Sequence, residues 1–318
     1  MRKTFLFRLF LSCLLTTLSC SALTEQLHFS KKKVADSYQF TYQWLDHRGD
    51  EQNMQFLLTK EAIFNRFRSF RAYKSEFAER AIFQAMRQQW LISPVAGVQV
   101  NFPTSAAYSN IEINGKDQAK VQLAYQKLSD IKQACTTAYL DDNFYHAFTT
   151  PDQIIGIKPN HVKIANNSVD DFSLMKPLIL EKVSIQNIRQ VTDYVLSFVQ
   201  SIPYSPLESR LNSSGAGFNP PSKLLWENQG DCDSKVTLTA TMLRALMPRI
   251  AMVLVFIDQH AFIGISIPSV GDDISIDVNG INYVLAEPTG PALLRLGQLA
   301  PSSEQAIYNG HYITETFH

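Results

Sequence analysis

The chain has 318 residues, of which 45% are hydrophobic and 11% aromatic, and its 29 basic residues balance its 29 acidic residues. This composition is typical of a globular protein with sizeable cores, and the length predicts two domains. The balanced charge gives no basic surface for nucleic acid, and the run Lys31 to Lys33 is too short to supply one.

The first residues are typical of a secretory signal peptide. Arg2 and Lys3 precede an apolar stretch from Thr4 to Leu18, which is too short for a stable membrane span. Small residues follow, and we expect cleavage after Ala22. Residues 1–22 are therefore predicted to be a signal peptide, and the mature protein is expected in the periplasm or outside the cell.

Lipid anchoring at Cys20 is the alternative to cleavage after Ala22. Thr17 stands where a lipoprotein signal has leucine, so we favour cleavage. The longest later apolar stretch is interrupted by Asp258, Gln259 and His260, and we expect no transmembrane segment in the mature chain.

An N-terminal α+β domain is predicted over residues 23–170. Aromatic and polar residues alternate from Ser37 to Leu45, and a turn leads to a returning strand at Met54 to Leu58. The alternating aromatic face could bind carbohydrate, but a sheet packed against helices is favoured. Periodicity predicts helices over 60–70, 76–90 and 117–140, strands over 153–157 and 161–164, and a polar boundary at 166–171.

Two cysteines remain after removal of the signal peptide, Cys135 and Cys232. Cys135 lies within the predicted helix 117–140, where an ordinary buried core residue is expected. This cysteine count argues against a disulfide scaffold and suits a single free reactive thiol.

The region 171–318 is predicted to form the second domain. A helix is expected from Ser184 as N-cap to about Ile202, and a second helix from Asp231 or Asp233 to Met247. Strands are expected over 250–257, 260–267 and 281–286.

Three residues in this region suit nucleophilic thiol catalysis. Cys232 stands on the first turn of a predicted helix, where unpaired N–H groups favour a thiolate although two aspartates flank it. His260 begins one strand and Glu287 follows another, so the three side chains could meet. A zinc site would need paired ligands at close spacing, such as C-x-x-C, which the sequence lacks.

The stretch from about Leu178 to Gln298 resembles the bacterial transglutaminase-like cysteine peptidase superfamily. Besides the trio, Ser197 to Tyr204 resembles the helix that precedes the family's nucleophile, and Glu287-Pro288-Thr289 resembles its acidic motif. The resemblance implies a papain-like core, with Cys232 as nucleophile, His260 as base and then acid, and Glu287 orienting His260. Many relatives have aspartate at the third position.

The resemblance implies a secreted or periplasmic thiol hydrolase, a protease or amidase, acting on protein or peptide amides of the cell envelope. Transglutaminase-type acyl transfer and an inactive binding or assembly module are the alternatives. The backbone N–H of Cys232 is available to the oxyanion, with Gln229, Trp226 and Tyr204 as candidate side-chain donors. No cofactor is expected, but some relatives bind calcium near the nucleophile, and Asp231 and Asp233 are candidate ligands against the simpler role of capping the helix.

Overall fold

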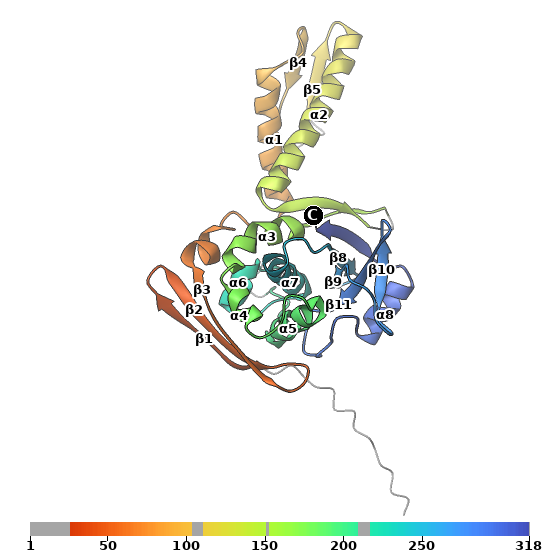
Figure 1. Cartoon of the computed structure of the whole chain (residues 1–318). Coiled ribbons are helices and arrows are strands. Elements are labelled where there is room, and N and C mark those ends of the chain that lie inside the picture. The colour runs from red at the N-terminus through yellow and green to blue at the C-terminus, as the bar shows by residue number, and fades with distance from the viewer. Residues whose placement is uncertain (1–25, 104–110, 151–152, 209–216, 318) are drawn as a thin grey trace, which may run out of the picture.

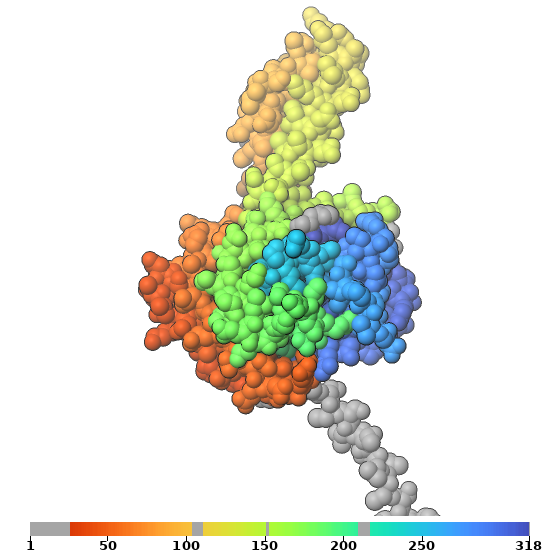
Figure 2. All heavy atoms as spheres, in the orientation of Figure 1, coloured from red at the N-terminus to blue at the C-terminus, as the bar shows by residue number. Residues whose placement is uncertain are grey.

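The computed structural model describes residues 26–103, 111–150, 153–208 and 217–317. The predicted signal peptide, its cleavage site and Cys20 lie outside the described residues. A rounded body carries a long arm of helices that projects from one end (Figures 1 and 2). The chain mixes helices with antiparallel sheets, which confirms the predicted α+β class.

None of the described helices combines the length and the apolar character that crossing a bilayer requires.

A three-stranded antiparallel sheet opens the described chain, with β1 (Gln26–Val34), β2 (Ser37–Leu45) and β3 (Glu51–Thr59) in sequence order. The predicted hairpin of β2 and β3 is confirmed. Phe40, Tyr42 and Trp44 are fully buried on one face of β2, so this face is a packing surface, as favoured above, rather than an open sugar-binding surface.

The arm consists of α1 (Ser75–Ile92), β4 (Val98–Asn101), β5 (Glu112–Gly115) and α2 (Gln118–Asp142). Asp117 caps α2 by accepting from the backbone N–H of Ala119 at 3.0 Å. Cys135 is buried in the small core between the two helices, as expected. The predicted helix at 60–70 is reduced to the single π-helical turn η1 (Glu61–Asn65).

The chain returns to the body through a hairpin of β6 (Tyr145–Thr149) and β7 (Ile155–Pro159). The strand predicted at 161–164 is wrong, because these residues begin α3 (His161–Ser168). Asn160 caps this helix by accepting from the N–H of Lys163 at 2.9 Å, a start signal that the β-branched residues around it obscured. The short elements η3 (Val169–Phe172) and α4 (Met175–Leu180) follow.

The remaining chain forms a five-stranded antiparallel sheet with helices. The helices are α5 (Ile188–Ser201), α6 (Pro221–Glu227), α7 (Cys232–Leu246) and α8 (Pro301–Tyr308). The strands are β8 (Met252–Ile257), β9 (His260–Ile265), β10 (Ser275–Val278), β11 (Ile281–Ala286) and β12 (Ile313–Phe317), in the spatial order β10-β11-β9-β8-β12. The N-cap of α5 is Asn187, not the predicted Ser184, because the Asn187 side chain accepts from Gln190 N–H at 3.1 Å.

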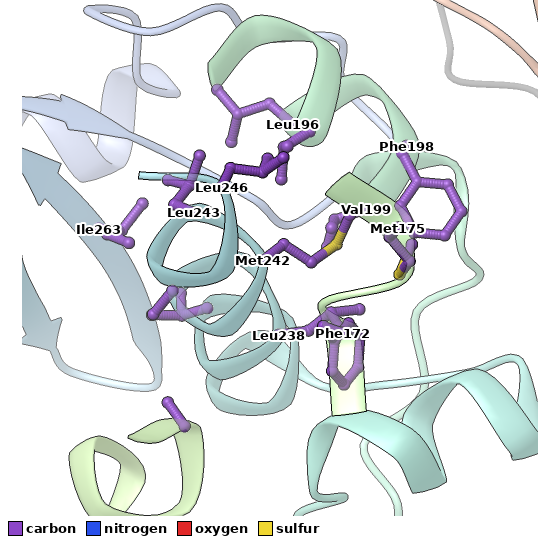
Figure 3. Packing of buried hydrophobic residues seen from close by; sticks show 14 of the residues in the cluster. Phe172, Met175, Leu196, Phe198, Val199, Leu238, Met242, Leu243, Leu246 and Ile263 are labelled. Carbon is purple, nitrogen blue, oxygen red and sulfur yellow. The ribbon is translucent and has the colours of Figure 1, made fainter. Parts of the chain in front are cut away.

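Helix α7 lies at the centre of the main core. Its apolar side chains point in several directions, with Ile263 of β9 on one side and Phe172, Met175 and Phe198 on the other (Figure 3). The same core includes Phe40 and Trp44 of β2, so it continues across the domain boundary predicted near residue 170. The N-terminal sheet therefore supports the helices on which the candidate site is built.

Candidate active site

Cys232 is the first residue of α7, and the chain before it is tightly fixed. Asp231 caps the helix by accepting from the N–H of Ser234 at 3.0 Å. A Cβ atom on Gly230 would lie 2.7 Å from Leu224 Cδ1, so the position accepts only glycine without a shift of the core. Gly230 also pairs with the 203–205 segment, donating its N–H to Pro203 O at 3.2 Å.

His260 is placed by the tight turn between β8 and β9. Gln259 adopts a left-handed conformation (φ +56°) in this turn, and His260 then pairs with Ile257 as the first residue of β9. Its Nδ1 lies 2.8 Å from Cys232 Sγ, and its Nε2 lies 2.6 Å from Glu287 Oε1. One imidazole ring therefore bridges the thiol and the carboxylate.

Glu287 follows the last residue of β11 and is 6% exposed. Its Oε2 accepts from the backbone N–H of Ala300 at 2.9 Å, and its backbone carbonyl accepts from the Gln200 side chain at 2.9 Å. Both ends of the residue are thus held in place. The structure brings the predicted trio together; the catalytic roles of its members remain a prediction.

The electrostatic surroundings favour a charged His260. Burial alone would lower the pKa of His260, but its hydrogen bonds to Cys232 and Glu287 outweigh burial and raise that pKa to about 9. The ring is therefore an imidazolium at neutral pH. A cation in contact with the sulfur favours the thiolate form of a cysteine.

The two aspartates that flank Cys232 have different surroundings. Burial, followed by the charge of Asp233, raises the pKa of Asp231 to about 7, which lessens its opposition to a thiolate at neutral pH. Asp233 lies with Oδ2 3.6 Å from Nε2 of the fully buried His161. Within the described ranges, no three His, Cys, Asp or Glu residues are grouped so as to hold a metal ion.

A cleft of about 770 Å³ opens beside the thiol. Its walls come from the start of α7, the β8–β9 turn, the β6–β7 hairpin and the segment before β12. Its lining includes Phe148, Lys158, Tyr204, Cys232, Asp233, Asp258, His260 and Tyr312. A substrate in this cleft would have its reacting group within reach of both Cys232 and His260.

The three candidate oxyanion donors differ in position. Tyr204 lines the cleft, and its side chain is half exposed. Trp226 is not brought to the site: its ring packs on Tyr38, with centroids 4.7 Å apart, and lies under the Lys31 ammonium at 3.8 Å. The indole thus packs α6 against the N-terminal sheet. Gln229 is not among the described residues that line the cleft.

Sequence reasoning did not single out several residues that shape this site. Gln200 supports Glu287 from the buried end of α5, and Lys235 lies buried one turn after Cys232. Each is a long polar residue next to apolar residues of a helix, which is a signal that could have been used. Phe148 and Lys158 reach the cleft only through the packing of a distant hairpin, and nothing local in the sequence indicates that placement.

Searches of protein-family models, curated proteins and solved structures found no match to this chain. The resemblance to transglutaminase-like peptidases therefore depends on the sequence motifs alone.

Proposed function

We propose that the protein is a thiol hydrolase, a protease or amidase, which cleaves amide bonds of proteins or peptides through an acyl-enzyme on Cys232. The observation that carries this proposal is the bridging position of His260, 2.8 Å from the thiol and 2.6 Å from the Glu287 carboxylate, beside an open cleft. We assign the surrounding elements to a papain-like, transglutaminase-like core and the mature protein to the periplasm or the extracellular space.

The first half of the reaction forms the acyl-enzyme. The Cys232 thiolate attacks the amide carbon, which forms an S–C bond and places a negative charge on the carbonyl oxygen. The His260 imidazolium then gives its Nδ1 proton to the leaving nitrogen, the C–N bond breaks, and a thioester and a free amine remain. Glu287 accepts the Nε2–H, and this keeps Nδ1 facing the sulfur.

The second half releases the acyl group. Neutral His260 takes a proton from water as the water oxygen forms a bond to the thioester carbon. The S–C bond then breaks, which releases a carboxylic acid and restores the thiolate–imidazolium pair. The backbone N–H of Cys232 has no acceptor within its own helix, and Tyr204 borders the cleft. These are the two donors that we assign to the oxyanion.

Labelling of the thiols tests whether the site is catalytic. Iodoacetamide at neutral pH is expected to alkylate Cys232 rapidly, with Cys135 as an internal control in the same molecule. Burial raises the pKa of Cys135, which is 8% exposed, so its alkylation should be slow. If Cys232 reacts no faster than Cys135, the protein is a binding module and the proposal fails.

Substrate cleavage is tested with a peptide library derived from a proteome. The wild-type protein should create new peptide N-termini that mass spectrometry detects, and Cys232→Ala should create none, whereas Cys135→Ala should behave as wild type. A labelled primary amine added to the same reaction distinguishes the outcomes, because stable amine incorporation would identify acyl transfer rather than hydrolysis.

A further inference from the structure

A fully buried lysine stands one helical turn after the candidate nucleophile. Lys235 is 0% exposed and stands three residues after Cys232 in α7, on the next turn of the helix. Lysine is almost never fully buried unless it is paired. The ion pairs formed by the described residues do not include Lys235. Its ammonium is therefore held without a carboxylate in direct contact.

The hydrogen bond of Lys235 connects α7 to the segment that borders the cleft. Its Nζ donates to the carbonyl of Ile202, the residue that follows α5. The next residues pair with Gly230, since Gly230 donates to Pro203 O at 3.2 Å and Ser205 donates to Gly230 O at 3.1 Å. Tyr204, between these two bonds, reaches the cleft beside Cys232. Lys235 thus fastens the segment that carries Tyr204 to the helix that carries the thiol.

The charge of Lys235 also acts on the thiol. Burial lowers the pKa of Lys235 to about 8, and the negative charges of Cys232 and Asp231 oppose this decrease. Lys235 therefore remains mainly a cation at neutral pH, close to a sulfur that must become an anion. The titratable groups that share this environment are Asp231 and Asp233 from the start of α7, Tyr204 from the 202–205 segment, His260 from β9 and Glu287 after β11.

We propose that Lys235 is a positioning residue and the buried counter-ion of the Cys232 thiolate, and that it fastens the Tyr204 segment beside the nucleophile. The inference rests on the proposed function. Burying a cation without a paired carboxylate costs folding free energy. A lysine at this position thus carries a desolvation cost and favours the reactive form of the thiol.

Lys235→Met separates these two effects. The variant removes a buried charge but also leaves the Ile202 carbonyl without its donor, so its unfolding temperature is expected to stay within a few degrees of that of wild type. In alkylation by iodoacetamide followed from pH 5 to 10, Cys232 should react roughly tenfold more slowly than in wild type at neutral pH and no more slowly at the alkaline end. Lys235→Gln keeps a donor for Ile202 but loses the charge, and it should show the same change.

Thr241→Val is the matched control. Thr241 is fully buried in α7, and its hydroxyl donates to Thr237 O at 2.8 Å, farther along the helix from the thiol. This variant should lose some stability because it removes a buried hydrogen bond, yet it should leave the alkylation profile unchanged. A shift caused by general loosening of α7 would appear in this control as well.

Three results would overturn the inference. The first is an unchanged alkylation profile in both Lys235 variants, whatever their stability. The second is a shift of equal size in Thr241→Val. The third is failure of both Lys235 variants to fold, which would make the residue a structural one. If wild-type Cys232 itself reacts no faster than Cys135, the proposed function fails instead, so the two failures are distinguishable.

Discussion

Replacement of Glu287 by glutamine removes one negative charge and one of the two side-chain oxygens, both of which accept a hydrogen bond. The carboxylate accepts from His260 Nε2 at 2.6 Å and from Ala300 N–H at 2.9 Å. A glutamine has one oxygen, so its amide group must face either the imidazole or the backbone N–H. If the amide faces His260, the ring loses the acceptor that keeps its proton on Nε2, and Nδ1 no longer faces the sulfur as the proton acceptor.

The size of the effect follows from these contacts. Loss of the carboxylate removes one of the two hydrogen bonds that raise the pKa of His260 to about 9, so the imidazolium should be lost at a lower pH in the variant. We expect kcat to fall by about a hundredfold to ten-thousandfold with KM little changed, since Glu287 orients His260 and does not touch substrate. One unsatisfied buried group should cost about 1 to 3 kcal/mol of stability.

The assay is alkylation of Cys232 by iodoacetamide from pH 5 to 10, followed by peptide cleavage once a substrate is identified. Glu287→Gln should react more slowly near pH 7, and Glu287→Asp should react faster than Glu287→Gln, because its charge remains. Asp193→Asn is the control: Asp193 accepts from Leu296 N–H at 2.9 Å, in the same C-terminal region but outside the site. Wild-type reactivity in Glu287→Gln would refute the reasoning.

Four further outcomes are expected. Cys232→Ser should abolish peptide cleavage and leave the unfolding temperature within a few degrees of wild type; near-normal turnover would contradict a thiol nucleophile. His260→Ala should lower the cleavage rate by about a hundredfold or more, and unchanged activity would exclude His260 as the base. His260 has a pKa of about 9 in the folded protein, against about 6.5 for an unperturbed histidine, so its protonation stabilises the fold fully below pH 6.5, and this contribution should be lost as pH rises through 9. Thermal unfolding between pH 6 and 10 that shows no such loss relative to His260→Ala would contradict the ion pair. Gly264→Ala should destabilise the sheet by about 1 to 3 kcal/mol in urea unfolding, because the new Cβ would lie 2.6 Å from Val253 Cγ1, and an unchanged midpoint would contradict that packing.

The elements that carry the candidate site were predictable because their signals are local. An aspartate cap followed by helical apolar spacing identifies α7, and unbroken apolar runs identify β8 and β9. β1 and β12 were not predicted. Most of β1 is exposed, and β12 has partly exposed polar residues, so neither shows a buried strand pattern. Their strand conformation depends on pairing with β2 and β8, which is a long-range effect.

The residues of the candidate site also differ in whether local sequence signals or long-range packing determine their place. Residue type and position at the element ends indicated Cys232, His260 and Glu287, because a thiol, an imidazole and a carboxylate are the groups that nucleophilic thiol chemistry would use. The sequence did not reveal where the Trp226 ring packs, since proximity in sequence to Cys232 does not show that the ring contacts Tyr38 of the N-terminal sheet. The hydrogen bond of Lys235 to Ile202 joins positions 33 apart and depends on how α5 and α7 pack.

The core shared by the first sheet and the later helices has a consequence for the order in which the chain can fold. Trp44 donates to the hydroxyl of Ser197, 153 positions later, and Tyr42 donates to the carbonyl of Leu225, 183 positions later. During synthesis, the aromatic face of β2 emerges long before its cover is made. Closing such long loops is slow, and the exposed rings are prone to aggregation until it is complete. The contacts of Cys232 with His260, and of Glu287 with Ala300, also need residues from late in the sequence, so the candidate site is assembled only when nearly the whole chain has been made.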